Sequence, residues 1–290
     1  MRLSCLPVSL YPDLAAGRLT PGDWLRRAAA LGLDGADLSV AHVPSRAPVV
    51  LDRLRTEAAD AGIAIAILAA YPDFTHPNSA ERRRQEDELR AWIDAAARLG
   101  AGLVRVTAGQ AHPGVREADG LAWAAAGLTS CLDHASAAGV RLIYENHVRG
   151  AGWTLNDFTQ PAARFLDVVR RTDGSGLAIL FDTANNLALD EDPLEVLEAV
   201  RHRLGAVHLS DLRQRGTFEP VLIGTGVAPL EPLLRRVVEI GFNGWLSIEE
   251  ASRTGDDAFR AAAETADRLW AAAGGHRRAC RVSRAHRPRA

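Results

Sequence analysis

The sequence has 290 residues, 47% of them apolar and 24% charged, which suits the large core of one α/β barrel domain. Its net charge is −2, and because the last 17 residues hold six arginines and no acid, residues 1–273 carry −8. Such an acidic body argues against nucleic-acid binding. No apolar run reaches the roughly 18 residues of a membrane span, and the N-terminus lacks a secretory signal, so we expect a cytoplasmic protein that does not bind membranes.

Two residue types exclude further classes of chemistry. The three cysteines are far apart and form no CxxC pair, so neither a disulfide framework nor a cysteine zinc site is expected. The sequence contains no lysine, which excludes catalysis through a Schiff base on this chain.

Short apolar runs alternate with longer amphipathic stretches from end to end. The runs predict strands at residues 2–8, 35–40, 63–70, 103–108, 140–145, 177–182, 205–210 and 245–250. The stretches predict helices at 22–32, 49–62, 80–100, 120–139, 161–171, 193–205, 230–241 and 256–275. Eight strands alternating with eight helices favour a closed (β/α)₈ TIM barrel over an open doubly wound sheet. We expect a single barrel domain over residues 1–273 and a basic, disordered tail over 274–290.

Four polar residues stand at the carboxyl ends of the last four predicted strands, where parallel barrels place their active sites. They are Glu145, Asp182, His208 and Glu249, spaced 37, 26 and 41 residues apart, about one βα unit each. Neighbouring strand ends lie about 5 Å apart, so these side chains should converge. Three converging carboxylates repel one another, and a shared cation keeps them all ionised. The residues therefore predict a divalent-metal site for Mn²⁺, Mg²⁺, Co²⁺ or Zn²⁺.

At these residues the chain resembles the xylose isomerase-like barrels, in particular the sugar phosphate isomerase/epimerase group. The matching motifs are YENH at 144–147, FDTAN at 181–185, VHLSD at 207–211 and GFNGWLSIEE at 241–250. The resemblance implies one Mn²⁺-like ion held by the four residues above. It also implies that Glu145 and Glu249 transfer protons beside the carbonyl of a small polyhydroxylated substrate, through a metal-stabilised enediolate.

Further positions are candidates for substrate contact, each with a structural alternative. Asn185 stands where many relatives carry a histidine, and it is either a sugar ligand or a turn residue. His147 lies on the loop above the barrel mouth, and Asp211 either orients His208, contacts substrate or caps a loop. Arginines beyond the VHLSD motif are further candidates, with Arg213 preferred to Arg215. The aromatic candidates are Tyr71, Phe74 and Trp153, and the glycine-rich segment 223–229 is expected to be a structural loop.

The expected function is that of a metal-dependent isomerase or epimerase, and the sequence allows a homo-oligomer. A dehydratase acting on an inosose or dehydroshikimate is the alternative, because loss of a β-hydroxyl can follow the same first step. An abasic-site endonuclease is disfavoured, since the third and fourth predicted strand ends offer no additional histidines. A catalytically silent binding barrel is disfavoured by the pair of glutamates.

Overall fold

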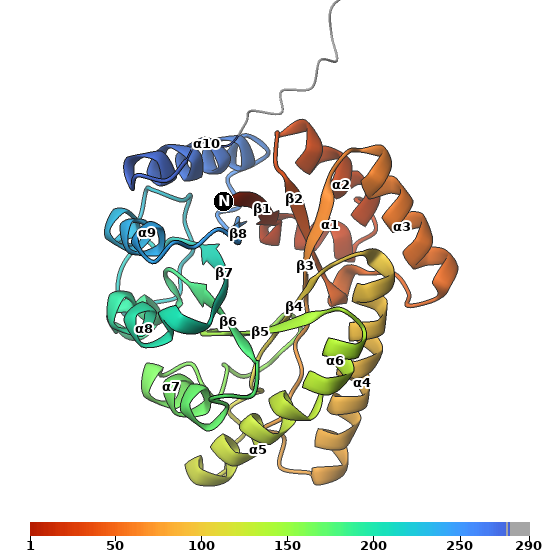
Figure 1. The fold of residues 1–290 in the computed structure, drawn as a ribbon, viewed down its shortest axis with the longest axis vertical. Coiled ribbons are helices and arrows are strands. Elements are labelled where there is room, and N and C mark those ends of the chain that lie inside the picture. The colour runs from red at the N-terminus through yellow and green to blue at the C-terminus, as the bar shows by residue number, and fades with distance from the viewer. Residues whose placement is uncertain (277, 279–290) are drawn as a thin grey trace, which may run out of the picture.

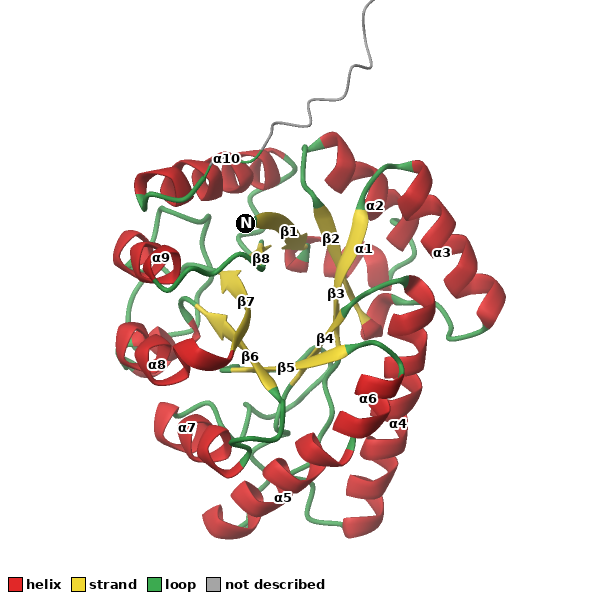
Figure 2. Ribbon diagram, in the orientation of Figure 1, coloured by secondary structure: helices red, strands yellow, loops and turns green. Residues whose placement is uncertain are grey.

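The computed structural model describes residues 1–276 and 278, and eight parallel strands form a nearly closed barrel inside a ring of helices (Figures 1 and 2). The hydrogen-bonded order is β1-β8-β7-β6-β5-β4-β3-β2, which confirms the predicted barrel. The strands are β1 (Arg2–Leu6), β2 (Gly35–Ser39), β3 (Ala64–Ala69), β4 (Leu103–Val106), β5 (Arg141–Glu145), β6 (Ala178–Asp182), β7 (Leu204–Leu209) and β8 (Trp245–Glu249).

The helices follow the predicted segments, with short additions in the loops. The α-helices are α1 (Tyr11–Ala15), α2 (Pro21–Ala30), α3 (Pro48–Asp60), α4 (Ser79–Leu99), α5 (Glu117–Ser130), α6 (Leu132–Ala137), α7 (Ala162–Arg171), α8 (Pro193–Val200), α9 (Leu230–Glu239) and α10 (Asp257–Ala272). Four 3₁₀ turns, η1 (Val8–Leu10), η2 (Val40–His42), η3 (Asn185–Leu189) and η4 (Arg201–Arg203), were not predicted.

The predicted helix at 120–139 is two helices, α5 and α6, which meet at Cys131. The hydroxyls of Thr129 and Ser130 donate to backbone carbonyls three or four residues earlier, and such bonds bend helices. A prediction of one continuous helix was therefore wrong at this point.

The barrel closes between β1 and β2 through bonds at a few points. The Asp34 amide donates to the Leu3 carbonyl at 2.9 Å, and the Leu3 amide donates to the Asp34 carboxylate at 2.9 Å. The Ser4 hydroxyl donates to Asp37 at 3.3 Å. On the same side of the molecule, Arg278 forms ion pairs with Asp34 at 3.1 Å and with Asp267 of α10 at 2.7 Å. The rest of the predicted tail lies outside the described residues, except for residues 274–276.

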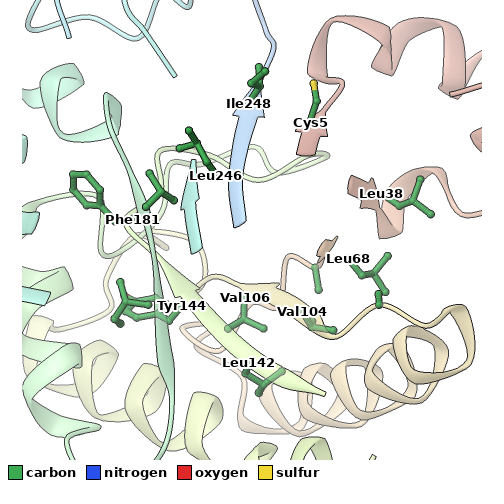
Figure 3. Close-up of a cluster of buried hydrophobic side chains, with 14 of the residues drawn as sticks. Cys5, Leu38, Leu68, Val104, Val106, Leu142, Tyr144, Phe181, Leu246 and Ile248 are labelled. Atoms are coloured by element: carbon green, nitrogen blue, oxygen red, sulfur yellow. The ribbon is translucent and has the colours of Figure 1, made fainter. Parts of the chain in front are cut away.

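Alternation along the strands separates two cores. Side chains that point outward pack against the helices, among them Cys5, Tyr144, Phe181 and Ile248 (Figure 3). Side chains that point inward include Ile143, Leu180, Ala206 and Trp245, which fill the lower part of the barrel. Successive strand residues face opposite sides, so the residues two positions beyond Ile143, Leu180 and Ala206 also point into the barrel.

No helix in the described part of the chain combines the length and apolar character needed to cross a bilayer.

Replacing Gly127 in α5 with alanine should destabilise the fold, although alanine is the better helix former. An added Cβ would lie 2.3 Å from the Phe74 ring, which is fully buried. We expect a loss of about 1–3 kcal/mol in the free energy of unfolding, measured by urea denaturation. Gly102→Ala is the control, because nothing lies within 4 Å of its Cβ. Equal stability of the two variants would contradict the packing argument.

Candidate metal centre

The four predicted ligands meet at the carboxyl ends of β5 to β8. Glu145, Asp182, His208 and Glu249 each offer one ligand atom, and these atoms lie within 4.8 Å of one another. Each follows an inward-facing residue by two positions, so the strand period aims it into the barrel. Asp182 and His208 are register partners of β6 and β7. The predicted convergence is confirmed.

His208 lies between the two glutamates. Its Nδ1 is 2.7 Å from Glu145 Oε1 and 3.2 Å from Glu249 Oε2. Glu145 and His208 are buried, whereas the Glu249 side chain keeps 18% of its surface exposed. The two carboxylates thus reach one nitrogen from β5 and β8, and Glu249 is the one in contact with solvent.

Asp182 is held in place by the start of the following loop. The Ser210 hydroxyl lies 2.8 Å from both carboxylate oxygens, and the amides of Ala184 and Asn185 donate to Oδ1 at 2.9 and 2.7 Å. The Asn146 side chain accepts from the Asp182 amide at 2.8 Å. These bonds fix the direction of the carboxylate before any ligand binds.

The electrostatics of the cluster call for a cation. Burial, with the charges of Glu249 and Glu145, raises the pKa of Asp182 to about 7. Burial alone would also raise the pKa of Glu145, but the charges of Arg105 and His208 lower it to about 2. Burial lowers the pKa of His208, yet the adjacent Glu145 and Glu249 raise it well above its usual value. A protonated His208 would therefore offset part of the negative charge that a metal ion would otherwise balance.

The donor set fits one divalent ion. Three carboxylates and one imidazole are oxygen and nitrogen donors of the kind that Mn²⁺, Mg²⁺, Co²⁺ and Zn²⁺ accept, and no thiol joins the four residues. Both described cysteines, Cys5 and Cys131, are buried, and Cys5 belongs to the outer core.

Arg105 of β4 is a site residue that the sequence reasoning missed. Its guanidinium is buried, with Nε 3.1 Å from Glu145 Oε2. It stacks 4.3 Å from the centre of the Tyr71 ring and donates to the Ala70 carbonyl at 3.2 Å. An arginine inside the apolar run LVRV was the available signal, because a buried charge needs a partner.

A second missed group lies beneath the centre. Asp37, in the middle of β2, accepts from the hydroxyls of Ser4 and Ser247 and from the Ile67 amide. Burial raises its pKa to about 6. Alternation places all three polar side chains inside the barrel, which links β1, β2 and β8 below the ligands.

A pocket of about 450 Å³ opens above the ligands. Glu249 lies in its wall with Arg105, Tyr71 and His147, and loops after β5, β7 and β8 form its rim. Its volume falls within the range of small-molecule sites. A larger cavity of about 720 Å³ lies at the opposite end of the barrel, around Trp245, away from the ligands.

Two predicted substrate contacts, His147 and Tyr71, line the pocket of about 450 Å³ above the four candidate ligands. His147 Nδ1 lies 3.6 Å from Asp157, and the Tyr71 hydroxyl lies 3.4 Å from that of Tyr11. Trp153 stands edge-on to His147 with 6.1 Å between the ring centres, and it lines the adjoining cavity. Phe74 is instead fully buried against α5 and lies outside the pocket.

Two other predicted residues bond to the backbone of the loops. The Asn185 amide group donates to the Asn146 carbonyl at 3.0 Å. The Asp211 carboxylate accepts from the amides of Gly224, Gly226 and Ala228 at 2.8–3.0 Å. This supports the loop-capping alternative for Asp211, and it explains the glycine-rich segment, because a Cβ on Gly226 would lie 2.3 Å from that carboxylate.

The candidate arginines after β7 are paired with acids on exposed loops. Arg213 lies 2.5 Å from Glu219, and Arg215 pairs with Asp190. Glu219, but neither arginine, lines the pocket. The roles of Arg213, Asn185 and Asp211 toward a substrate stay predictions.

Comparison with known proteins agrees with the barrel fold. A family model described as xylose isomerase-like TIM barrel matches residues 25–271. A putative hydroxypyruvate isomerase of Streptomyces coelicolor is 29% identical over 79% of this chain and 84% of its own length. An inosose dehydratase of Lacticaseibacillus casei is 26% identical over 43% of this chain, and the match spans 45% of that relative. A solved D-tagatose 3-epimerase-like protein has a TM-score of 0.77 at 18% identity, over 94% of this chain and 98% of that one.

Replacing Asp182 with asparagine should stabilise the metal-free protein more at pH 8 than at pH 5. A carboxyl whose pKa is raised by folding contributes stability that is full below its unfolded pKa of about 3.9 and is lost as the pH rises through about 7. We expect the melting temperature of the wild type to fall below that of Asp182→Asn by roughly 2–6 °C at pH 8.

The control is Asp173→Asn, at an exposed position. Thermal unfolding of both variants and the wild type, each stripped with a chelator, would be followed from pH 5 to pH 8. If the curve for Asp182→Asn ran parallel to that of the wild type, the proposed repulsion would be absent.

Proposed function

Because the chain belongs to the xylose isomerase-like TIM barrel family, we propose that it is a divalent-metal-dependent isomerase or epimerase of a small polyhydroxylated carbonyl compound. One observation carries the proposal. Glu145 and Glu249 approach the same nitrogen of His208 from β5 and β8, and Glu249 faces the pocket. Two carboxylates around one point can supply the base and the acid for proton transfer from and to carbon.

Glu145, Asp182, His208 and Glu249 would hold the ion, with Mn²⁺ favoured. When bound, the ion would act as a Lewis acid that polarises the substrate carbonyl and stabilises the enediolate. Glu249 would remove the proton from the carbon beside that carbonyl, because it is the one of the two glutamates that faces the pocket. Glu145 would first take up a proton from water and then deliver it from the β5 side, and its carboxylate forms an ion pair with Arg105.

The names of the relatives agree with chemistry of this kind but span two reaction classes. The Streptomyces coelicolor relative is named for an isomerisation and the Lacticaseibacillus casei relative for a dehydration. Both classes can begin with removal of a proton beside a carbonyl, so the residues that hold the ion do not distinguish them.

Glu249→Gln should abolish turnover without loss of the ion, because glutamine keeps an oxygen donor but does not accept the proton. We expect a decrease in kcat of about 10²–10⁴-fold for Glu249→Gln and for Glu145→Gln. The measurement is deuterium uptake from D₂O into a panel of ketoses, with metal content determined on the same samples. Glu264→Gln, on the exposed face of α10, is the control. Full exchange by both site variants with metal bound would refute the proton-transfer roles.

A dehydratase is the second candidate, and one contact favours it. The ion pair with Arg105 holds the pKa of Glu145 at about 2, which makes this carboxylate a weak base. His147 also lines the pocket, and it could donate a proton to a departing hydroxyl.

Incubation with ketoses and inososes separates the two reactions. An isomerase or epimerase yields a new sugar, whereas a dehydratase yields an enone that absorbs ultraviolet light. His147→Gln should slow enone formation by about tenfold or more while deuterium exchange beside the carbonyl continues. Formation of a new sugar with no enone would exclude the dehydratase.

A further inference from the structure

The pocket above the metal centre contains two arginines without acidic partners. Arg149 follows β5 and Arg253 follows β8, and both line the pocket with exposed side chains. Among residues 1–276 and 278, no carboxylate lies within ion-pair distance of either guanidinium. Two other arginines near the site do have acidic partners, since Arg105 pairs with Glu145 and Arg213 pairs with Glu219.

Formal charges distinguish Arg149 and Arg253 from the other charged groups of the pocket, whose charges balance one another. The three carboxylate ligands, one divalent ion and the Arg105 guanidinium sum to zero when His208 is neutral. Glu219, the remaining acid of the pocket wall, is neutralised by Arg213. Among the residues that line the pocket, Arg149 and Arg253 are therefore the two positive charges without an acidic partner. This local excess of positive charge contrasts with the net charge of −8 that residues 1–273 carry as a whole.

The backbone of Arg253 is held in a conformation that favours glycine. Its φ is 56°, in the left-handed region, which few non-glycine residues adopt. Its amide donates to the Ser9 hydroxyl at 2.8 Å. The turn before it is fixed by the buried Glu250, whose side chain accepts from the amide and hydroxyl of Ser252. Such conformations persist where the surroundings impose them, and they concentrate at functional sites.

We infer that the substrate carries an anionic group, a phosphate or a carboxylate, that Arg149 and Arg253 bind while its carbonyl end lies at the metal centre. The inference rests on the proposed function, since it concerns the same pocket. Guanidinium groups pair with the oxygens of either anion through charge-assisted hydrogen bonds. A pocket of about 450 Å³ can accommodate a sugar-sized chain between the arginines and Glu249.

The test compares three sugars that differ in charge. They are D-fructose, D-fructose 6-phosphate and 5-keto-D-gluconate, titrated calorimetrically into the full chain loaded with Mn²⁺. We expect at least one anionic sugar to bind about tenfold or more tightly than D-fructose, and this preference to shrink at high salt. The phosphate and carboxylate sugars identify which anion the arginines prefer.

Arg149→Gln and Arg253→Gln should each lower the affinity for the anionic sugar by about five- to tenfold and leave that for D-fructose unchanged. Arg253→Lys should recover part of the affinity. Arg201→Gln is the control, because Arg201 lines the cavity at the opposite end of the barrel. Equal binding of all three sugars, or a preference that survives in the double variant, would overturn the inference. Turnover is measured separately, so an intact preference without any catalysis would refute the proposed function alone.

Discussion

Repulsion among three clustered carboxylates, two of them buried, is the interaction around which the upper half of this barrel is arranged. Glu145, Asp182 and Glu249 occupy one small volume, and each of the groups nearby reduces the cost of that concentration of charge. Arg105 pairs with Glu145, Ser210 and two backbone amides bind Asp182, and His208 bridges the two glutamates. The cluster is thus a candidate cation site whose repulsion lowers stability as long as no cation offsets it.

Alternation along the strands makes this arrangement compatible with a well-packed fold. Outward positions of the same strands carry Tyr144, Phe181 and Ile248, which pack under the helices. Inward positions change from apolar at the base of the barrel to polar at its mouth, from Trp245 through Ser247 to Glu249 along β8. Because β5 to β8 each contribute both kinds of residue, the outer core and the candidate metal centre are built from the same strands without sharing side chains.

The sequence was informative where a local pattern determines the outcome. Eight apolar runs predicted the barrel, and the polar residues at the ends of the last four predicted the four candidate ligand positions, since strand period and strand order suffice for both. Roles that depend on partners far along the chain were not accessible in this way. Arg105 acquires its role from Glu145, 40 positions later, and Asp211 acquires its role from amides of a loop whose path no local rule specifies. Phe74 was predicted among the aromatic residues of the pocket, but its ring packs instead against α5 at Gly127, where no side chain occupies the space.

The closure between β1 and β2 has a consequence for local unfolding. Seven strand pairs form backbone ladders, whereas β1 and β2 are the two ends of the hydrogen-bonded order. Side chains of Asp34 and Asp37 make part of this connection, and Arg278 holds Asp34 from outside. Fewer backbone bonds must break here than elsewhere, so partial opening of the barrel would begin at this junction. The four candidate ligands stand on β5 to β8, whose ladders to one another would stay paired, so the candidate metal centre would survive such an opening.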